Sequence, residues 1–424
     1  MPKFPADLAR AVTNKWPNLV GGEEYIVPEI PSPKLLNAIF ECSYLTAATQ
    51  EEGRYPHFNL VVVRKGTDIR SVGAVPFKFE QSRPMDVSEL RRLAPASDLG
   101  KSAVWVEFDE NCAVIAGLAD LGTSWSRARL GFAYNYRVPH CLIIQIDRPG
   151  RMKVYQGQFH IATLSDGDLV INGGLDLHVF LHETVNRGLE SLAEHFEPPK
   201  IESPRDFEDF WFIAHWNIFA SIANSISLSG HGGTLIIVDP QDSEVMSCLR
   251  IKYSGQFDAL RNAFIEFINA RNKTADFYEA AELEGKQVSK RVFEAESTLF
   301  TATDQLVEAT RFIARLASCD GAIVVSPDFR LLGFGAEIRA EMKDDITVKN
   351  VINEMGREYA SCDVEQFGMR RRSAVKLASR QERFVVLTVS QDGPISAIWR
   401  EKQDVFVKRG VSLANMNMPW TGGP

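Results

Sequence analysis

The residues best suited to chemistry in this chain flank a short apolar run that begins at Ala322. Asp320 and Gly321 stand immediately before the run, and a Ser-Pro-Asp turn follows it. A second apolar segment, with Gly335 at its end, then predicts the return strand of a hairpin. A carboxylate at a strand end, beside glycines that let a ligand approach the backbone, is typical of a metal or phosphate site. Taken alone, the Asp-Gly pair is more typical of an ordinary turn.

Three consecutive arginines form a second candidate group, about fifty residues further on. Gly368 and Met369 precede Arg370, Arg371 and Arg372, and the chain then continues as a helix-like segment. A guanidinium makes paired, charge-assisted hydrogen bonds to phosphate oxygens, and the start of a helix favours a bound anion over a cation. The run therefore indicates phosphate binding, while the alternative is a solvated helix start or an ion-pair cluster.

Two further segments belong to the same pattern. A buried strand over residues 384–389 ends in a turn that carries Ser390, Gln391 and Asp392. Upstream, two glycines open another apolar strand, over residues 234–238. A glycine pair before a strand is by itself more often a flexible entry than a phosphate cradle, and the Gly-Lys-Ser/Thr of a P-loop is missing here.

The order of these segments resembles the diadenylate cyclase domain, which joins two ATP molecules into cyclic di-AMP. That family carries Asp-Gly-Ala and Arg-His-Arg motifs, matched here at residues 320–322 and 370–372, and a Ser-Glu turn, matched at residues 390–391. Its Gly-x-Leu-Ile-Val-Ile first strand looks like residues 232–238. The resemblance covers roughly the C-terminal half of the chain, while the N-terminal half resembles only the sensor regions joined to such domains.

The resemblance implies ATP as the substrate and Mg²⁺ or Mn²⁺ as the cofactor. It makes Asp320 the catalytic residue, as a metal ligand or as the group that activates a 3′-hydroxyl, with Gln391 and Asp392 as further metal ligands. Two nucleotides must meet face to face, so it also implies a homo-oligomer. The nucleotide-binding residues that it implies are Gly321, Ala322, Gly335, Gly368, Arg370, Arg371, Arg372 and Ser390.

Three positions depart from the family's motifs. Met369 stands where the family has threonine, Arg371 where it has histidine and Gln391 where it has glutamate. Methionine lacks the hydrogen bonds of a hydroxyl, and arginine can neither accept a proton nor bind a metal as histidine does. Two hypotheses therefore stay open. One is a diadenylate cyclase, which the retained Asp320 favours, and the other is a degenerate cyclase-like domain that binds a nucleotide as a sensor module without turnover.

Composition predicts a soluble, cytoplasmic protein. A length of 424 residues predicts two or three domains, and a net charge of −8 argues against nucleic-acid binding. The six cysteines include no Cys-x-x-Cys pair, which fits a reducing compartment better than a disulfide framework. No apolar run approaches the eighteen or so residues that span a bilayer, so we expect no membrane partner.

The order of elements along the chain predicts two domains of the α+β or α/β class. Residues 1–30 are Pro-rich and weakly patterned, as expected of an arm, and a helix is predicted after Ser32, which can cap it. Residues 55–175 are strand-rich, with helices on either side. A Pro-rich connector then divides a sensor or regulatory domain, 1–200, from a nucleotide-binding domain, 201–424, with a mixed β-sheet flanked by helices.

Two helical segments carry further predictions. Residues 207–227 are apolar almost all round, which predicts a buried helix, whereas residues 276–297 are charged, as in a solvated helix or an insertion. His178 and His182 lie one helical turn apart, with Glu183 beside the second, and such a pair can hold a metal. No third ligand is identifiable, so an ordinary packed helix with solvated or capped histidines is favoured.

Overall fold

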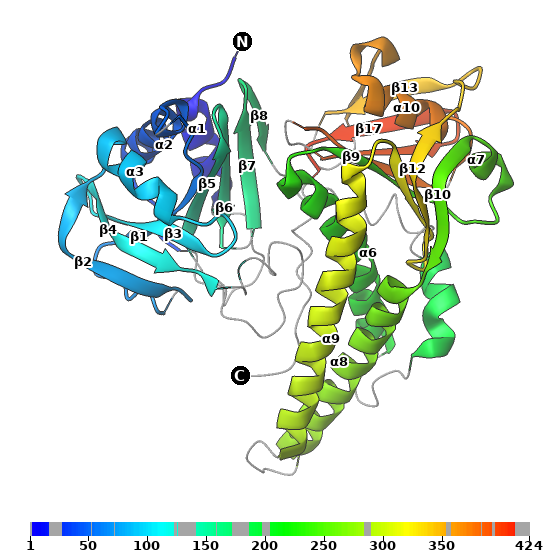
Figure 1. Cartoon of the computed structure of the whole chain (residues 1–424), viewed down its shortest axis with the longest axis horizontal. Helices are drawn as coiled ribbons and strands as arrows, with labels where there is room; N and C mark the ends of the chain where they lie inside the picture. Colours follow the sequence, from blue (N-terminus) through cyan, green and yellow to red (C-terminus); the bar gives the residue numbers. More distant parts are fainter. Residues whose placement is uncertain are drawn as a thin grey trace. The chain divides into compact units, whose positions relative to one another are not determined.

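The computed structural model describes residues 2–16, 28–51, 53–71, 73–122, 125, 141–157, 159–171, 186–196, 204–283, 290–352, 358–382, 384–391 and 395–411 of the 424-residue chain. The chain divides into two compact units, Met1–Gly173 and Gly174–Pro424. Each unit contains a mixed β-sheet with helices packed on it, so the predicted fold class is confirmed (Figure 1).

The sheet of the first unit has eight strands: β1 (Phe58–Arg64), β2 (Val75–Pro84), β3 (Ser102–Phe108), β4 (Ala113–Asp120), β5 (Leu142–Arg148), β6 (Arg151–Gln156), β7 (Phe159–Ser165) and β8 (Asp168–Ile171). Their order across the sheet is β2-β4-β3-β1-β5-β6-β7-β8. β1 and β3 are parallel, and the other neighbours are antiparallel. The strand-rich character predicted for this part of the chain is therefore confirmed.

In the described part of this unit, three helices lie with the sheet: α1 (Pro5–Lys15), α2 (Pro33–Ala48) and α3 (Val87–Leu93). The Oγ of Ser32 accepts a hydrogen bond from the N–H of Leu35 at 3.4 Å, so the predicted cap of α2 is confirmed. The prediction of an N-terminal arm was wrong for residues 5–15. Leu8 and Val12 stand one helical turn apart and are fully buried against the sheet, which gives α1 a packed face.

The sheet of the second unit has nine strands: β9 (Gly233–Ile237), β10 (Leu249–Phe257), β11 (Ala322–Val325), β12 (Leu331–Ile338), β13 (Thr347–Val351), β14 (Tyr359–Ser361), β15 (Val385–Val389), β16 (Ile395–Glu401) and β17 (Asp404–Arg409). Their order is β10-β12-β11-β9-β15-β16-β17-β13-β14. The predicted hairpin is confirmed as β11 and β12, which are antiparallel. In its turn the N–H of Phe329 donates to the carbonyl oxygen of Ser326 at 3.0 Å.

Helices cover both faces of this second sheet. α10 (Met369–Ala378) packs over the apolar side chains of β9, β15 and β16 on one face. On the other face α6 (Pro204–Ser229) lies between the sheet and α9 (Lys290–Arg315), and most of its described side chains, including Trp216, Phe219 and Ile222, are buried. The predicted buried helix is thus confirmed.

α9 and α8 (Ala259–Leu283) lie side by side as a pair of long helices (Figure 1). The charged stretch 276–297 supplies the end of α8 and the beginning of α9, apart from residues 284–289, which lie outside the described part of the chain. This stretch therefore extends the two helices instead of forming a helix of its own. A short helix, α7 (Ser243–Ser247), precedes β10.

Residues 186–196 belong to the second unit. The Oγ of Ser191 donates to Oδ2 of Asp328 at 3.1 Å, and Nε2 of His195 lies 2.9 Å from Nη2 of Arg261. Residues 197–203, which contain most of the predicted connector, lie outside the described residues. The domain boundary between residues 200 and 201 therefore stays a prediction.

Candidate functional site

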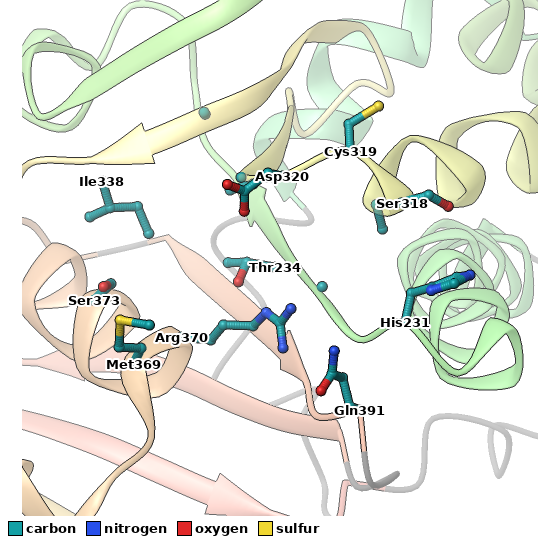
Figure 2. A pocket seen from close by; sticks show the side chains of 15 residues that line it. His231, Thr234, Ser318, Cys319, Asp320, Ile338, Met369, Arg370, Ser373 and Gln391 are labelled. Carbon is teal, nitrogen blue, oxygen red and sulfur yellow. The ribbon is translucent and has the colours of Figure 1, made fainter.

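A cavity of about 350 Å³ opens at one end of the central strands of the second sheet (Figure 2). Five separate stretches of the chain form its wall. The lining residues are His231, Gly233, Thr234, Ala317, Ser318, Cys319, Asp320, Gly321, Ala322, Ala336, Ile338, Met369, Arg370, Ser373 and Gln391.

The topology of the sheet explains why these stretches meet. β9 lies between β11, to which it is parallel, and β15, to which it is antiparallel. The start of β9, the start of β11 and the end of β15 therefore lie next to one another at the same end of the strands, where Gly233 pairs with Val389. α10 begins at the same end of the strands, with Gly368 as its N-cap residue.

Asp320 stands immediately before β11 and is exposed to the cavity. No hydrogen bond or ion pair joins its carboxylate to any residue that the structure describes. In Figure 2 the carboxylate lies on one side of Thr234 and the guanidinium of Arg370 on the other. A carboxylate with no protein partner, facing a cavity, is available to a bound cation or hydroxyl group.

Gly321 and Gly335 face each other across the hairpin. Gly321 has a φ of +112°, and a Cβ on it would lie 2.5 Å from the carbonyl carbon of Gly335. Glycine is therefore required by the close approach of β11 and β12. Gly321 and Ala322 line the cavity, whereas Gly335 acts on it through this packing.

The three arginines have three different environments. Arg370 reaches into the cavity, where its Nη1 lies 3.1 Å from the position of a Cβ built on Gly232, and no described residue pairs with it. Arg371 donates from Nη2 to the Oγ of Ser390 at 3.2 Å. Arg372 donates from Nη1 to Oε2 of Glu365 at 2.6 Å. Of the three, only Arg370 lines the cavity.

The environment of Arg371 is partly buried and crowded with positive charge. Burial, with the nearby charge of Arg409, lowers the pKa of the Arg371 guanidinium from its ordinary value. The guanidinium also stands over the ring of Phe367, 5.9 Å from its centroid. These contacts hold Arg371 and Ser390 together beside the cavity, but neither of them lines it.

The remaining predicted residues fall in different places. Gln391 lines the cavity beside Arg370 (Figure 2). Gly368 accepts a hydrogen bond from the N–H of Arg372 at 3.1 Å, as the first residue of a helix does, and is not part of the wall. Asp392 lies outside the described residues, so its proposed role as a metal ligand is not addressed by the structure.

Sequence reasoning missed several wall residues, notably His231, Thr234, Ser318 and Ser373. The glycine pair before β9 was a signal for the first two, since it marked a strand that begins at the site. Cys319 also lines the cavity, although its sulfur points away from Asp320 in Figure 2. Ser373 lies one helical turn after Arg370, so both are on the same side of α10.

The oxygen donors at the cavity suit a cation that arrives with a phosphate ligand. Within the described residues, no three His, Cys, Asp or Glu side chains gather around a common point. Asp320 and the amide oxygen of Gln391 remain, and Mg²⁺ commonly binds through one or two carboxylates together with substrate phosphates. The residues therefore fit Mg²⁺ or Mn²⁺ carried by a nucleotide. His178, His182 and Glu183 lie outside the described part of the chain.

Comparison with known proteins bears on the first unit. A family described as the probable sensor domain DACNV matches residues 26–120. The matched segment contains α2, α3 and β1 to β4, so the N-terminal unit carries a probable sensor domain. No curated protein matches the chain. None of the described helices is long and apolar enough to cross a membrane.

Proposed function

We propose that the second unit binds ATP at this cavity and condenses two ATP molecules into cyclic di-AMP under the control of the sensor unit. One observation carries the proposal. Asp320 and Arg370, from two stretches about fifty residues apart, face one cavity, and neither has a partner among the described residues. A carboxylate for a hydroxyl or a cation and a guanidinium for phosphate are the two groups that this reaction needs.

The reaction consists of two identical displacements. The 3′-oxygen of one ATP attacks the α-phosphorus of the other, the bond from that phosphorus to the bridging oxygen breaks, and pyrophosphate leaves. The second displacement closes the ring, so two ATP give one cyclic di-AMP and two pyrophosphates. Asp320 orients the 3′-hydroxyl and accepts its proton, while Arg370 holds the triphosphate. Mg²⁺ or Mn²⁺ bound with the nucleotide supplies neutralising charge.

The size of the cavity supports one nucleotide per chain. Ligand pockets commonly measure roughly 300–1,000 Å³, and this one, at about 350 Å³, lies near the lower limit. Two nucleotides that react with each other then come from two copies of the chain. The proposed enzyme is therefore a face-to-face dimer or a larger homo-oligomer.

A second candidate is a nucleotide-binding sensor module that does not turn over. It is favoured by Met369, which lines the cavity with 78% of its surface exposed and offers no hydroxyl there. Arg371 also favours it, because its guanidinium is engaged with Ser390 instead of with the cavity. Both candidates share the binding site and differ only in chemistry.

The test is incubation of the purified full chain with ATP and Mg²⁺ or Mn²⁺, with mass spectrometry of the products and calorimetry with a non-hydrolysable ATP analogue. We expect cyclic di-AMP and two equivalents of pyrophosphate. Binding of the analogue without product formation would select the sensor module. No binding of the analogue at millimolar concentration would reject both candidates.

The double substitution Met369→Thr with Arg371→His separates the two candidates further. It restores a hydroxyl and an imidazole, and it removes the like charge beside Arg409. A sensor module should gain cyclic di-AMP synthesis that the parent chain lacks. An active parent enzyme should change only modestly in rate or in its preference between Mg²⁺ and Mn²⁺.

A further inference from the structure

One face of the eight-stranded sheet in the first unit changes from apolar to polar along the sheet. The opposite face packs on α1 and α2 and is mostly apolar, with Ile144 and Val154 among its residues. On the changing face, β1, β3 and β4 present an apolar cluster that includes Val61 and Trp105. Ile143 of β5 and Tyr155 of β6 still belong to this apolar cluster. Further along the same two strands, this face carries polar and charged side chains that are buried or largely buried: Gln145, Asp147, Arg151 and Lys153.

Among the described residues of β5 and β6, two cations and one carboxylate are charged and lie largely buried on this face. The side chains of Arg151 and Lys153 are 5% and 7% exposed, and that of Asp147 is 11% exposed. Nε of Arg151 lies 2.5 Å from Oδ1 of Asp147, and Nζ of Lys153 lies 3.3 Å from Oδ2. Burial raises the pKa of Asp147, but the charges of Lys153 and Arg151 outweigh it and hold the pKa below its ordinary value. Asp147 is therefore ionised.

The charges in this cluster do not balance. Among the described residues, Asp147 is the only carboxylate within ion-pair distance of either cation. Asp166 acts on Arg151 only at longer range and is paired with Arg148. Nη1 of Arg151 is buried and has no hydrogen-bond partner among the residues that the structure describes. An uncompensated buried charge with a free donor is costly, and a bound anion would remove both defects.

Neutral polar residues stand on both sides of Lys153. In the sheet it pairs with Gln145 on β5 and with Thr163 on β7, and both of these side chains are buried. Both side chains are hydrogen-bonded within the unit, Gln145 from Nε2 to Oδ1 of Asn59 at 3.1 Å and Thr163 through Oγ1 to Nε2 of His160 at 2.8 Å. They make the surroundings of Lys153 polar, and the cations supply the attraction for an anion. We propose that this face of β5, β6 and β7 binds a small anion, through a carboxylate or phosphate group held between Lys153 and Arg151.

This site would give the sensor unit a ligand distinct from the nucleotide of the second unit. The family match ends at residue 120, but β5 pairs with β1, so the polar strands continue the sheet of the matched domain. The proposal does not depend on cyclase activity. Its chemistry requires only that an anion stabilise the folded state.

The test is thermal unfolding of the full chain in increasing inorganic phosphate or acetate, against sodium chloride of equal ionic strength. A ligand that binds only the folded state raises the unfolding midpoint with the logarithm of its concentration. We expect this rise with phosphate for a phosphate-bearing ligand, or with acetate for a carboxylate. Lys153→Met should abolish it. Arg92→Met, which breaks the exposed pair with Glu89, should leave it unchanged.

Phosphate also stabilises proteins in general, without binding at a particular site. Lys153→Met is the control for this effect, because general stabilisation persists when Lys153 is replaced. Asp147→Asn removes the competing carboxylate and should lower the half-saturating anion concentration about tenfold. Equal shifts in the parent and in Lys153→Met would overturn the proposal, as would a parent that neither anion stabilises beyond chloride. Should Lys153→Met not fold, an unchanged or raised half-saturating concentration in Asp147→Asn would overturn it.

Discussion

Two aspartates stand at the two ends of β11, and their surroundings differ completely. Asp320, before the strand, is exposed to a cavity and has no partner among the described residues. Asp328, in the turn after the strand, is 6% exposed and accepts hydrogen bonds at 2.5 to 3.1 Å from Ser326, Arg330 and Ser191. Nε of Arg261 lies 3.4 Å from the same carboxylate.

The difference separates a carboxylate that is bonded within the fold from one that we propose meets a ligand. Burial raises the pKa of Asp328, but its hydrogen bonds from Ser326 and Arg330 prevail and lower it. Asp328 joins the segment 186–196 and α8 to the hairpin, so its bonds define the position of β11. Asp320 stands just before the strand that those bonds hold in place, and the reaction proposed for it requires a carboxylate held in position in this way.

Removal of the charge on Asp320 should have the largest effect on activity. We expect Asp320→Asn to lower cyclic di-AMP synthesis by at least about 10²–10⁴-fold, the usual contribution of a positioned acid or base. The free energy of unfolding should change by less than about 0.5 kcal/mol, since the side chain has no partner among the described residues to lose. Parental turnover in Asp320→Asn would contradict the role given to this carboxylate.

Asp328→Asn should lower the free energy of unfolding, which Asp320→Asn leaves nearly unchanged. It leaves Arg330 and Arg261 beside a neutral group, and breaking a buried charge network of this kind costs about 3 kcal/mol. Urea unfolding of the two variants, side by side, measures the difference, and Asp320→Asn serves as the matched control. The distinction between the two aspartates would fail if Asp328→Asn were as stable as the parent chain.

A smaller effect is expected from substitution of two arginines, one of which faces the cavity while the other is paired with a carboxylate. Arg370→Met removes a cavity-facing guanidinium and should weaken the binding of an ATP analogue about ten- to a hundredfold, the value of one or more charge-assisted hydrogen bonds. Arg372→Met removes the same charge but only breaks the pair with Glu365, so binding should change less than about threefold. Calorimetry at one salt concentration compares them, and equal losses would mean that net charge alone matters.

The last prediction concerns pH and the turn that carries Asp328. His215 on α6 is fully buried and donates from Nε2 to the carbonyl oxygen of Pro327 at 2.6 Å. Burial lowers its pKa from 6.5 to about 4, so the folded chain keeps it neutral where the unfolded chain takes up a proton. The contribution of neutral His215 to the free energy of unfolding is therefore fully present above pH 6.5 and is lost as the pH falls toward 4. His215→Phe should flatten this slope in urea unfolding, and an unchanged slope would assign the acid sensitivity to other groups.

Local patterns in the sequence were sufficient for most of the elements around the site. The hairpin of β11 and β12, the cap of α2 and the buried α6 follow from turn residues, a capping serine and continuous apolar stretches. β10 was not predicted, because it is an edge strand whose side chains are mostly exposed and carry no regular apolar alternation. β13 and β14 were not predicted either, and they lie at the other edge of the same sheet.

The sequence by itself determined which residue types are available at the site: a carboxylate before one strand, and arginines and glycines before a helix. Only the tertiary structure decided which of them share a cavity. Successive residues on a helix point about 100° apart, so the packing of α10 on the sheet directs Arg370 to the cavity, Arg371 to Ser390 and Arg372 to Glu365. Likewise, the alternation along β5 and β6 separates polar from apolar residues, but only the folded sheet buries Arg151 and Lys153 beside a single carboxylate.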